Sequence, residues 1–226
     1  MAEIIVALDL PGRDEALRWL DRARGIRWAK VGSVLFTREG PAFVRELTAR
    51  GLQVFLDLKW HDIPNTVAGA VEGARELGVA MATVHTLGGI EMMRAAAVAA
   101  EGRVGIVGVT VLTSHTAEGY GVATGRGVVE PLEEVRRLAR GAAGAGLRGI
   151  VCSPHEVAGV RSVLPDGAWI VVPGIRRAGD AAGDQARVAG PREAVQGGAT
   201  HLVVGRPLLQ AADPAAAVRE FQEAAL

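Results

Sequence analysis

The sequence predicts an α/β protein folded as a single-domain (β/α)8 barrel of the TIM-barrel class. Two observations support this fold: short apolar runs rich in Val and Ile recur along the 226 residues, and stretches with helical spacing separate them. Runs that are apolar on both faces are typical of parallel strands covered by helices. Eight such strands, alternating with helices at intervals of roughly 20–30 residues, favour a closed barrel.

Each expected strand is a short run of mainly apolar residues. In chain order these runs are IIVAL (4–8), WAKV (28–31), QVFLDL (53–58), AMATV (80–84), VGIVGV (104–109), GIVC (149–152), WIVV (169–172) and HLVV (201–204). A doubly wound open sheet is the competing architecture, but it rarely needs eight strands. It would also carry a glycine-rich loop after the first strand, where this chain has Asp-Leu-Pro-Gly.

The stretches between these strands repeat apolar residues at the three- and four-residue spacing of an amphipathic helix. Those expected to be helical are residues 14–24, 66–77, 91–99, 131–142 and 215–225. No linker or low-complexity segment interrupts the alternation, so we expect residues 1–226 to form one domain.

The composition argues against several classes of protein. A formal net charge of zero, from 25 basic and 25 acidic residues, disfavours a nucleic-acid binder, and no apolar run approaches the roughly 20 residues that span a bilayer. The start MAEIIVALD enters a strand without a basic leader, so we expect a cytoplasmic protein with no membrane partner. The one cysteine, Cys152, fits that reducing compartment and is expected to be buried. No Cys/His cluster has zinc spacing, so no metal is expected.

The two lysines are the most informative residues in the chain. Lys30 and Lys59 are the only lysines among 25 basic residues, and both lie at the ends of expected strands. Arginine keeps its proton at any workable pH, whereas an ammonium group is compact, tunable and able to donate a proton. Lys59 also lies within the run from Asp57 to Asp62, which places two carboxylates close to it in sequence. The pattern therefore predicts a reactive site around Lys59.

Polar residues gather at or just beyond the C-terminal ends of the expected strands. In a barrel these ends meet on one face, which carries the active site. The residues concerned are Asp9, Lys30, Asp57, Lys59, His85, Thr110, Thr113, Pro173, Gly174, Gly205 and Arg206. The sequence thus predicts one shared site, although a packing role for His85 stays open.

The spacing of Asp57 and Lys59 suggests how this site is charged. Residues two apart on a strand face the same side, and Asp9 and Lys30 should arrive nearby from the first two strands. Alternating carboxylates and ammonium groups keep each other ionised. A purely structural ion-pair network is the alternative, and Asp62 could instead be a turn former before the next helix.

A second group of residues is expected to bind phosphate. The loops after strands seven and eight of a barrel frequently do so, and here they contain Arg176, Gly205 and Arg206. Glycine lets the backbone approach an anion, and arginine offers it paired donors. The polar segment 177–183 is long enough to close as a lid. In the alternative interpretation Arg206 only caps the barrel.

These residues resemble a known family. The run DLKWHDIPNT (57–66) occurs with ALD at 7–9, KVG at 30–32, VTVLTS at 109–114, PGIR at 173–176, GDQ at 183–185 and VVGRP at 203–207. In order and spacing, over essentially the whole chain, this resembles orotidine 5′-phosphate decarboxylase. The resemblance implies a homodimer that converts orotidine 5′-phosphate to UMP and CO2 without metal or organic cofactor, as the last step of de novo UMP synthesis.

The resemblance also implies a role for each matching residue. Lys59 would donate a proton to C6 of the pyrimidine, Asp57 would flank the leaving carboxylate, and Asp62 of the neighbouring subunit would complete the array with Lys30. The other implied contacts are Asp9 and Lys30 to the ribose, Thr66 from the neighbouring subunit, Thr113 and Ser114 to the pyrimidine, Gln185 from the lid to base and phosphate, and Arg176, Gly205 and Arg206 to the phosphate. Pro173 is also expected to bind the substrate.

Two other functions compete with this one. Magnesium-dependent members of the same superfamily act on ketose phosphates and share the Asp-x-Lys-x-x-Asp run. They carry an acid for the metal where this chain has Lys30, and a cation there opposes Mg²⁺. The second alternative is a non-catalytic barrel that binds a phosphorylated ligand, which the intact lysine and carboxylates disfavour.

Overall fold

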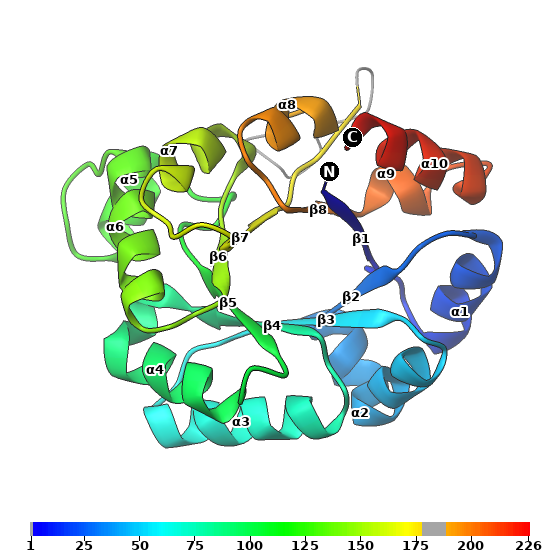
Figure 1. Ribbon diagram of the computed structural model, residues 1–226, viewed down its shortest axis with the longest axis horizontal. Helices are drawn as coiled ribbons and strands as arrows, with labels where there is room; N and C mark the ends of the chain where they lie inside the picture. The colour runs from blue at the N-terminus through cyan, green and yellow to red at the C-terminus, as the bar shows by residue number, and fades with distance from the viewer. Residues whose placement is uncertain (1, 178–188) are drawn as a thin grey trace.

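In the computed structural model, which describes residues 2–177 and 189–226, eight parallel strands close into a barrel surrounded by helices (Figure 1). The strands follow chain order around the barrel, and β8 pairs back with β1. This confirms the predicted (β/α)8 TIM-barrel fold.

The strands agree with the sequence-based ranges to within two residues at either end. They are β1 (Glu3–Ala7), β2 (Trp28–Gly32), β3 (Gln53–Trp60), β4 (Met81–His85), β5 (Gly105–Val109), β6 (Gly149–Val151), β7 (Trp169–Val172) and β8 (His201–Val204). Alternation of short apolar runs therefore located every strand of the barrel.

Helices lie outside the strands, as Figure 1 shows. They are α1 (Arg13–Arg22), α2 (Ser33–Ala49), α3 (Pro64–Glu76), α4 (Gly89–Ala99), α5 (Ala117–Ala123), α6 (Pro131–Gly144), α7 (Val157–Arg161), α8 (Pro191–Gln196), α9 (Arg206–Leu209) and α10 (Pro214–Ala224), with the 3-10 turns η1 (Thr86–Gly88) and η2 (Pro154–Glu156). No helix in the described part of the chain has the length and apolar character that a bilayer crossing requires.

Helix α2 is the longest element that the sequence analysis did not assign. It consists of two helical segments joined at Gly40, which adopts φ 62° and ψ −162°, with Pro41 at the start of the second segment. Proline cannot continue a regular helix and glycine tolerates this backbone conformation, so the apolar spacing breaks in the middle. Leu35 and Phe43, one on each segment, are both buried.

The barrel interior is filled by side chains rather than open. A compact cluster inside the strands contains Ile5, Ala7, Trp28, Phe55, Met81, Val107, Val171 and Val203. A larger apolar layer lies between the strands and the helices. The filled interior therefore separates the two ends of the barrel.

His201, the first residue of β8, packs against the rings of Trp28 and Trp169, with ring centroids 5.3 Å and 4.8 Å away. Burial, with a smaller contribution from the nearby Arg148, lowers the pKa of His201 from 6.5 to about 4. The unfolded chain therefore binds a proton between these two pH values that the folded chain excludes.

We expect acidification to destabilise the protein through this histidine. As the pH falls from 6.5 to about 4, the free energy of unfolding should drop by about 1.4 kcal/mol per pH unit because of His201. Urea denaturation across this range would measure the slope, and His201→Gln should make it shallower. An unchanged slope in the variant would contradict the assignment.

Candidate active site

A cavity of about 480 Å³ opens at the C-terminal ends of the strands. Of the polar strand-end residues predicted to share a site, most line it: Asp9, Lys30, Asp57, Lys59, Thr113, Pro173, Gly174, Gly205 and Arg206, and Arg176 of the predicted phosphate group joins them. The buried Cys152 lines it as well. The structure thus brings most of the predicted site residues together at one end of the barrel.

Four charged side chains form a continuous array along one wall of this cavity. The Lys59 ammonium donates to both oxygens of Asp57, at 2.9 Å each. Lys30 Nζ lies 3.6 Å from Asp57 Oδ2 and 3.1 Å from Asp9 Oδ1. Carboxylates and ammonium groups therefore alternate in the order Asp9, Lys30, Asp57, Lys59.

The array fixes the charge of Asp57. Burial of this side chain, which is 12% exposed, acts to raise its pKa, but the ammonium groups of Lys30 and Lys59 outweigh burial. The pKa of Asp57 consequently lies below its ordinary value. The carboxylate in turn holds the half-buried Lys59 amine in place through two hydrogen bonds.

The backbone around Lys59 is irregular. Between Leu56 and Trp60 the pairing of β3 with β4 shifts register, and Lys59 adopts a left-handed φ of 51°. Simple strand alternation does not apply across this bulge, although Asp57 and Lys59 still meet. The sequence analysis reached the correct contact from an assumption of regular strand geometry that fails here.

Thr83, on β4, holds this irregular segment and was not anticipated. Its hydroxyl accepts from the backbone N–H of Lys59 at 2.8 Å and donates to Asp57 Oδ1 at 3.0 Å. The side chain is fully buried. The one available signal was a threonine in the otherwise apolar core of that strand, which is too common in strands to mark a site.

Two polar strand-end residues play structural roles. Thr110 is buried and donates its hydroxyl to the carbonyl of Val151 at 2.7 Å, so it joins neighbouring strands. His85 stacks on His61 at 5.5 Å, and its Nδ1 accepts from the Leu87 N–H at 3.3 Å. Burial, with the nearby His61 and Lys59, lowers the pKa of His85 to about 4. Neither residue lines the cavity, and for His85 the packing alternative is correct.

Asp62, Thr66 and Ser114 lie outside the cavity lining of the single chain. Asp62 is exposed, and its carboxylate accepts from the backbone N–H of Ile63 at 2.6 Å, as a turn former does. Thr66 belongs to the first turn of α3 and is also exposed. Within one chain, then, these residues do not reach the charged array.

Two arginines and two glycines, which we call the cationic corner, also line the cavity: Arg176, Arg206, Gly174 and Gly205. Arg176 is buried and donates to the carbonyl of Ile175 at 2.8 Å, whereas Arg206 is exposed at the start of α9. Gly174 adopts a φ of 78°, a conformation that favours glycine. Gln185 and most of the expected lid lie outside the described residues.

A buried carboxylate, Glu134, anchors the segment 117–126 that follows β5. Glu134 on α6 accepts from the Tyr120 hydroxyl at 2.9 Å and from the guanidinium groups of Arg126 (2.6 Å) and Arg137 (2.7 Å). Hydrogen bonds from Arg137, Arg126 and Tyr120 outweigh burial and lower the pKa of Glu134 to about 2. This clasp ties residues 117–126 to the barrel.

We expect Glu134→Gln to destabilise the protein by roughly 2 kcal/mol at neutral pH, because a buried, charge-assisted network loses its anion. Chemical denaturation would measure this change. Glu133→Gln is the matched control: its side chain is 61% exposed in its pair with Arg136, so the substitution should cost less than about 1 kcal/mol. Equal losses in both variants would contradict the clasp.

Within residues 2–177 and 189–226, no group of three or more His, Cys, Asp or Glu side chains is arranged to hold a metal ion.

Comparisons with known proteins agree on one family. Residues 2–221 match the model of the orotidine 5′-phosphate decarboxylase / HUMPS family. A protein of Halorhodospira halophila named orotidine 5′-phosphate decarboxylase is 53% identical over 222 residues, covering 95% of this chain and 92% of that protein. One of the same name from Anaeromyxobacter sp. (strain K) is 56% identical over 191 residues, covering 84% and 83%.

Solved structures show the same similarity. The crystal structure of orotidine 5′-phosphate decarboxylase from Lactobacillus acidophilus superposes with a TM-score of 0.87 at 32% identity, covering 100% of this chain and 99% of that one. The strand-end cavity described above therefore occurs on a barrel shared with these proteins.

Proposed function

The chain belongs to the orotidine 5′-phosphate decarboxylase / HUMPS family, and on that premise we propose that it converts orotidine 5′-phosphate to UMP and CO2 in UMP biosynthesis. The observation that carries the proposal is the Lys59 ammonium, held by both oxygens of the largely buried Asp57 side chain in the strand-end cavity. Such an amine is fixed, charged and open to a ligand.

In the proposed reaction, the bond between C6 and the carboxylate carbon breaks and CO2 leaves. The electron pair stays on C6 in the plane of the ring, where the ring carbonyls delocalise it little. Lys59 transfers a proton to C6 to give UMP and later regains one from solvent. Asp57 would lie beside the departing carboxylate, and Lys30 keeps Asp57 ionised.

The electrostatic effect of Lys59 is large but limited. A fixed ammonium about 4 Å from the developing charge is worth roughly 4 kcal/mol at an effective dielectric of about 20, which is about a thousandfold in rate. Binding of the distant phosphate must therefore contribute by positioning the ring and closing the site.

The other residues are assigned to parts of the substrate. Their assignments are Asp9 and Lys30 to the ribose, Thr113 and Ser114 to the pyrimidine, Gln185 to base and phosphate, and Arg176, Gly205 and Arg206 to the phosphate, with Pro173 as a further substrate contact. The cavity supports those that line it, because the cationic corner and the charged array border the same space.

We propose that the reaction needs no metal or organic cofactor. Lys30 supports this, since its ammonium lies 3.1 Å from Asp9 and 3.6 Å from Asp57. A cation at that position neutralises the carboxylates that would otherwise attract Mg²⁺, the ion used by ketose-phosphate enzymes with a similar Asp-x-Lys-x-x-Asp run.

We propose further that the enzyme is a cytoplasmic homodimer of single-domain chains, with Asp62 and Thr66 completing the neighbouring subunit's site. Both are exposed and neither belongs to the cavity lining of its own chain. Ile63 (67% exposed) follows Asp62 directly, and Leu87 (40% exposed) donates its N–H to His85, which stacks on His61. These exposed apolar side chains give this face a reason to be covered.

The direct test of the function is the loss of ultraviolet absorbance when metal-free protein is mixed with orotidine 5′-phosphate. We expect complete conversion to UMP, with the same rate in the presence of EDTA. Activity abolished by EDTA would instead support the magnesium-dependent alternative, and ligand binding without turnover would support the non-catalytic barrel.

A further inference from the structure

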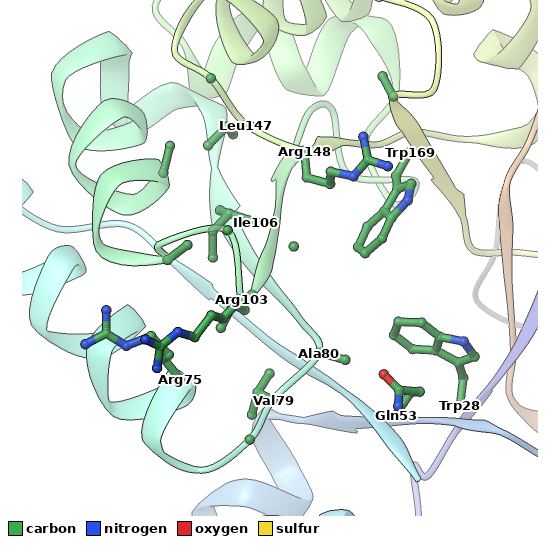
Figure 2. A pocket seen from close by; sticks show the side chains of 18 of the residues that line it. Trp28, Gln53, Arg75, Val79, Ala80, Arg103, Ile106, Leu147, Arg148 and Trp169 are labelled. Atoms are coloured by element: carbon green, nitrogen blue, oxygen red, sulfur yellow. The ribbon is translucent and has the colours of Figure 1, made fainter.

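A second cavity, of about 780 Å³, lies at the end of the barrel opposite the candidate active site (Figure 2). Its lining includes residues at the starts of strands: Trp28 of β2, Gln53 of β3, Gly105 of β5 and Trp169 of β7. The strand-end cavity uses the other ends of the strands, and the packed barrel interior separates the two. We call this second space the floor cavity.

Two tryptophans supply an aromatic wall. The rings of Trp28 and Trp169 meet edge to face at 6.3 Å, and Figure 2 shows them pointing toward one another. A Cβ atom on Gly105 would come within 2.0 Å of the Trp169 ring, so glycine is required for the indole to lie there. Trp169 is only partly buried, which leaves part of its surface open to a ligand.

Three arginines and one aspartate line the same space, so its charge is positive. Arg75 and Arg103 share the carboxylate of Glu101, at 2.5 Å and 3.4 Å. Arg148 has no carboxylate within ion-pair distance among the described residues; its guanidinium carbon lies 5.0 Å from the centre of the Trp169 ring. Being exposed, it keeps N–H donors available to an incoming acceptor.

We propose that the floor cavity binds a heteroaromatic ligand that carries an anionic group, of the size of a nucleoside monophosphate. Its volume falls in the range of roughly 300–1,000 Å³ that is typical of small-molecule sites. The ring packs on Trp169 and Trp28, the exposed amide of Gln53 offers a donor and an acceptor, and the anion pairs with Arg148. Occupancy is independent of decarboxylation because the barrel interior lies between the sites.

Nitrogen-15 labelling of the tryptophans tests this proposal, with adenosine 5′-monophosphate as the probe. The chain has four tryptophans. The indole N–H signals of Trp28 and Trp169 should shift as the probe is added and reach a plateau. The signal of Trp19, a buried residue whose indole N–H donates to the Leu208 carbonyl of α9, should not shift. Trp60 lines neither cavity but follows Lys59 in sequence, so among the four it is the one beside a strand-end cavity residue. A response confined to Trp60, or none at all, would overturn the proposal.

Variants separate the parts of the site. Arg148→Gln should weaken binding about tenfold, whereas the exposed Arg140 on α6 provides a matched control, Arg140→Gln, with unchanged binding. Adenosine and inorganic phosphate alone should each bind more weakly than the probe. If the protein bound adenosine as tightly as adenosine 5′-monophosphate, or if Arg148→Gln bound the probe as tightly as the unmodified protein, the proposed contact between Arg148 and the anion would be overturned.

A further variant tests the location of the probe even if Arg148→Gln fails to fold. In Arg206→Ala, which changes the strand-end cavity alone, the Trp28 and Trp169 shifts should persist. Their loss would place the probe in the strand-end cavity and refute a floor site.

Discussion

Lys59→Ala should lower the rate of orotidine 5′-phosphate decarboxylation by at least about a thousandfold while UMP still binds. The substitution removes the proton donor and the charge facing C6, yet leaves the cationic corner with Arg176 and Arg206 in place. Single-turnover kinetics and calorimetric titration with UMP would measure the two effects separately.

Arg219→Ala is the control for this experiment, because Arg219 is an exposed cation on α10 away from the cavity. Its turnover should match that of the unmodified enzyme. Unchanged turnover in Lys59→Ala would refute the assigned chemistry, and loss of UMP binding in step with turnover would reduce Lys59 to a binding residue.

Mixing inactive Asp62→Ala and Lys59→Ala subunits should restore about one quarter of the original activity. Random exchange makes half of the dimers mixed, and each mixed dimer holds one site with both residues intact. Specific activity after subunit exchange, verified by native mass spectrometry, provides the measurement.

A second mixture tests the geometry more strictly. Asp57 and Lys59 are hydrogen-bonded within one chain, so Asp57→Ala mixed with Lys59→Ala gives no intact site. Recovery should therefore be absent there. Recovery in both mixtures, or in neither despite proven exchange, would exclude a site shared in the proposed way.

The barrel could be predicted because every strand is a short apolar run, and burial on both faces leaves a strong signal. Helix α2 could not, because Gly40 and Pro41 break its periodicity although the backbone continues as a kinked helix. The short helices α5, α7, α8 and α9 also escaped, since four to seven residues hold too few turns to show a period.

The charged array could be predicted because parallel strands deliver their ends to one face of a barrel. The roles of Thr83 and Thr110 could not, because a hydroxyl in a strand carries no sign of what it will bond. The bonding partner of each hydroxyl depends on contacts between residues far apart in sequence: Thr83 lies 26 residues from Asp57, and Thr110 lies 41 residues from Val151.

Lys59 occupies a backbone conformation that glycine would adopt more easily, at φ 51°. Glycine has no amine, so the residue that best suits the main chain cannot perform the proposed proton transfer. Stability and activity therefore pull in opposite directions at this position. A search for more heat-resistant variants that ignored turnover would tend to replace Lys59. It would then yield a stable barrel that does not catalyse the reaction.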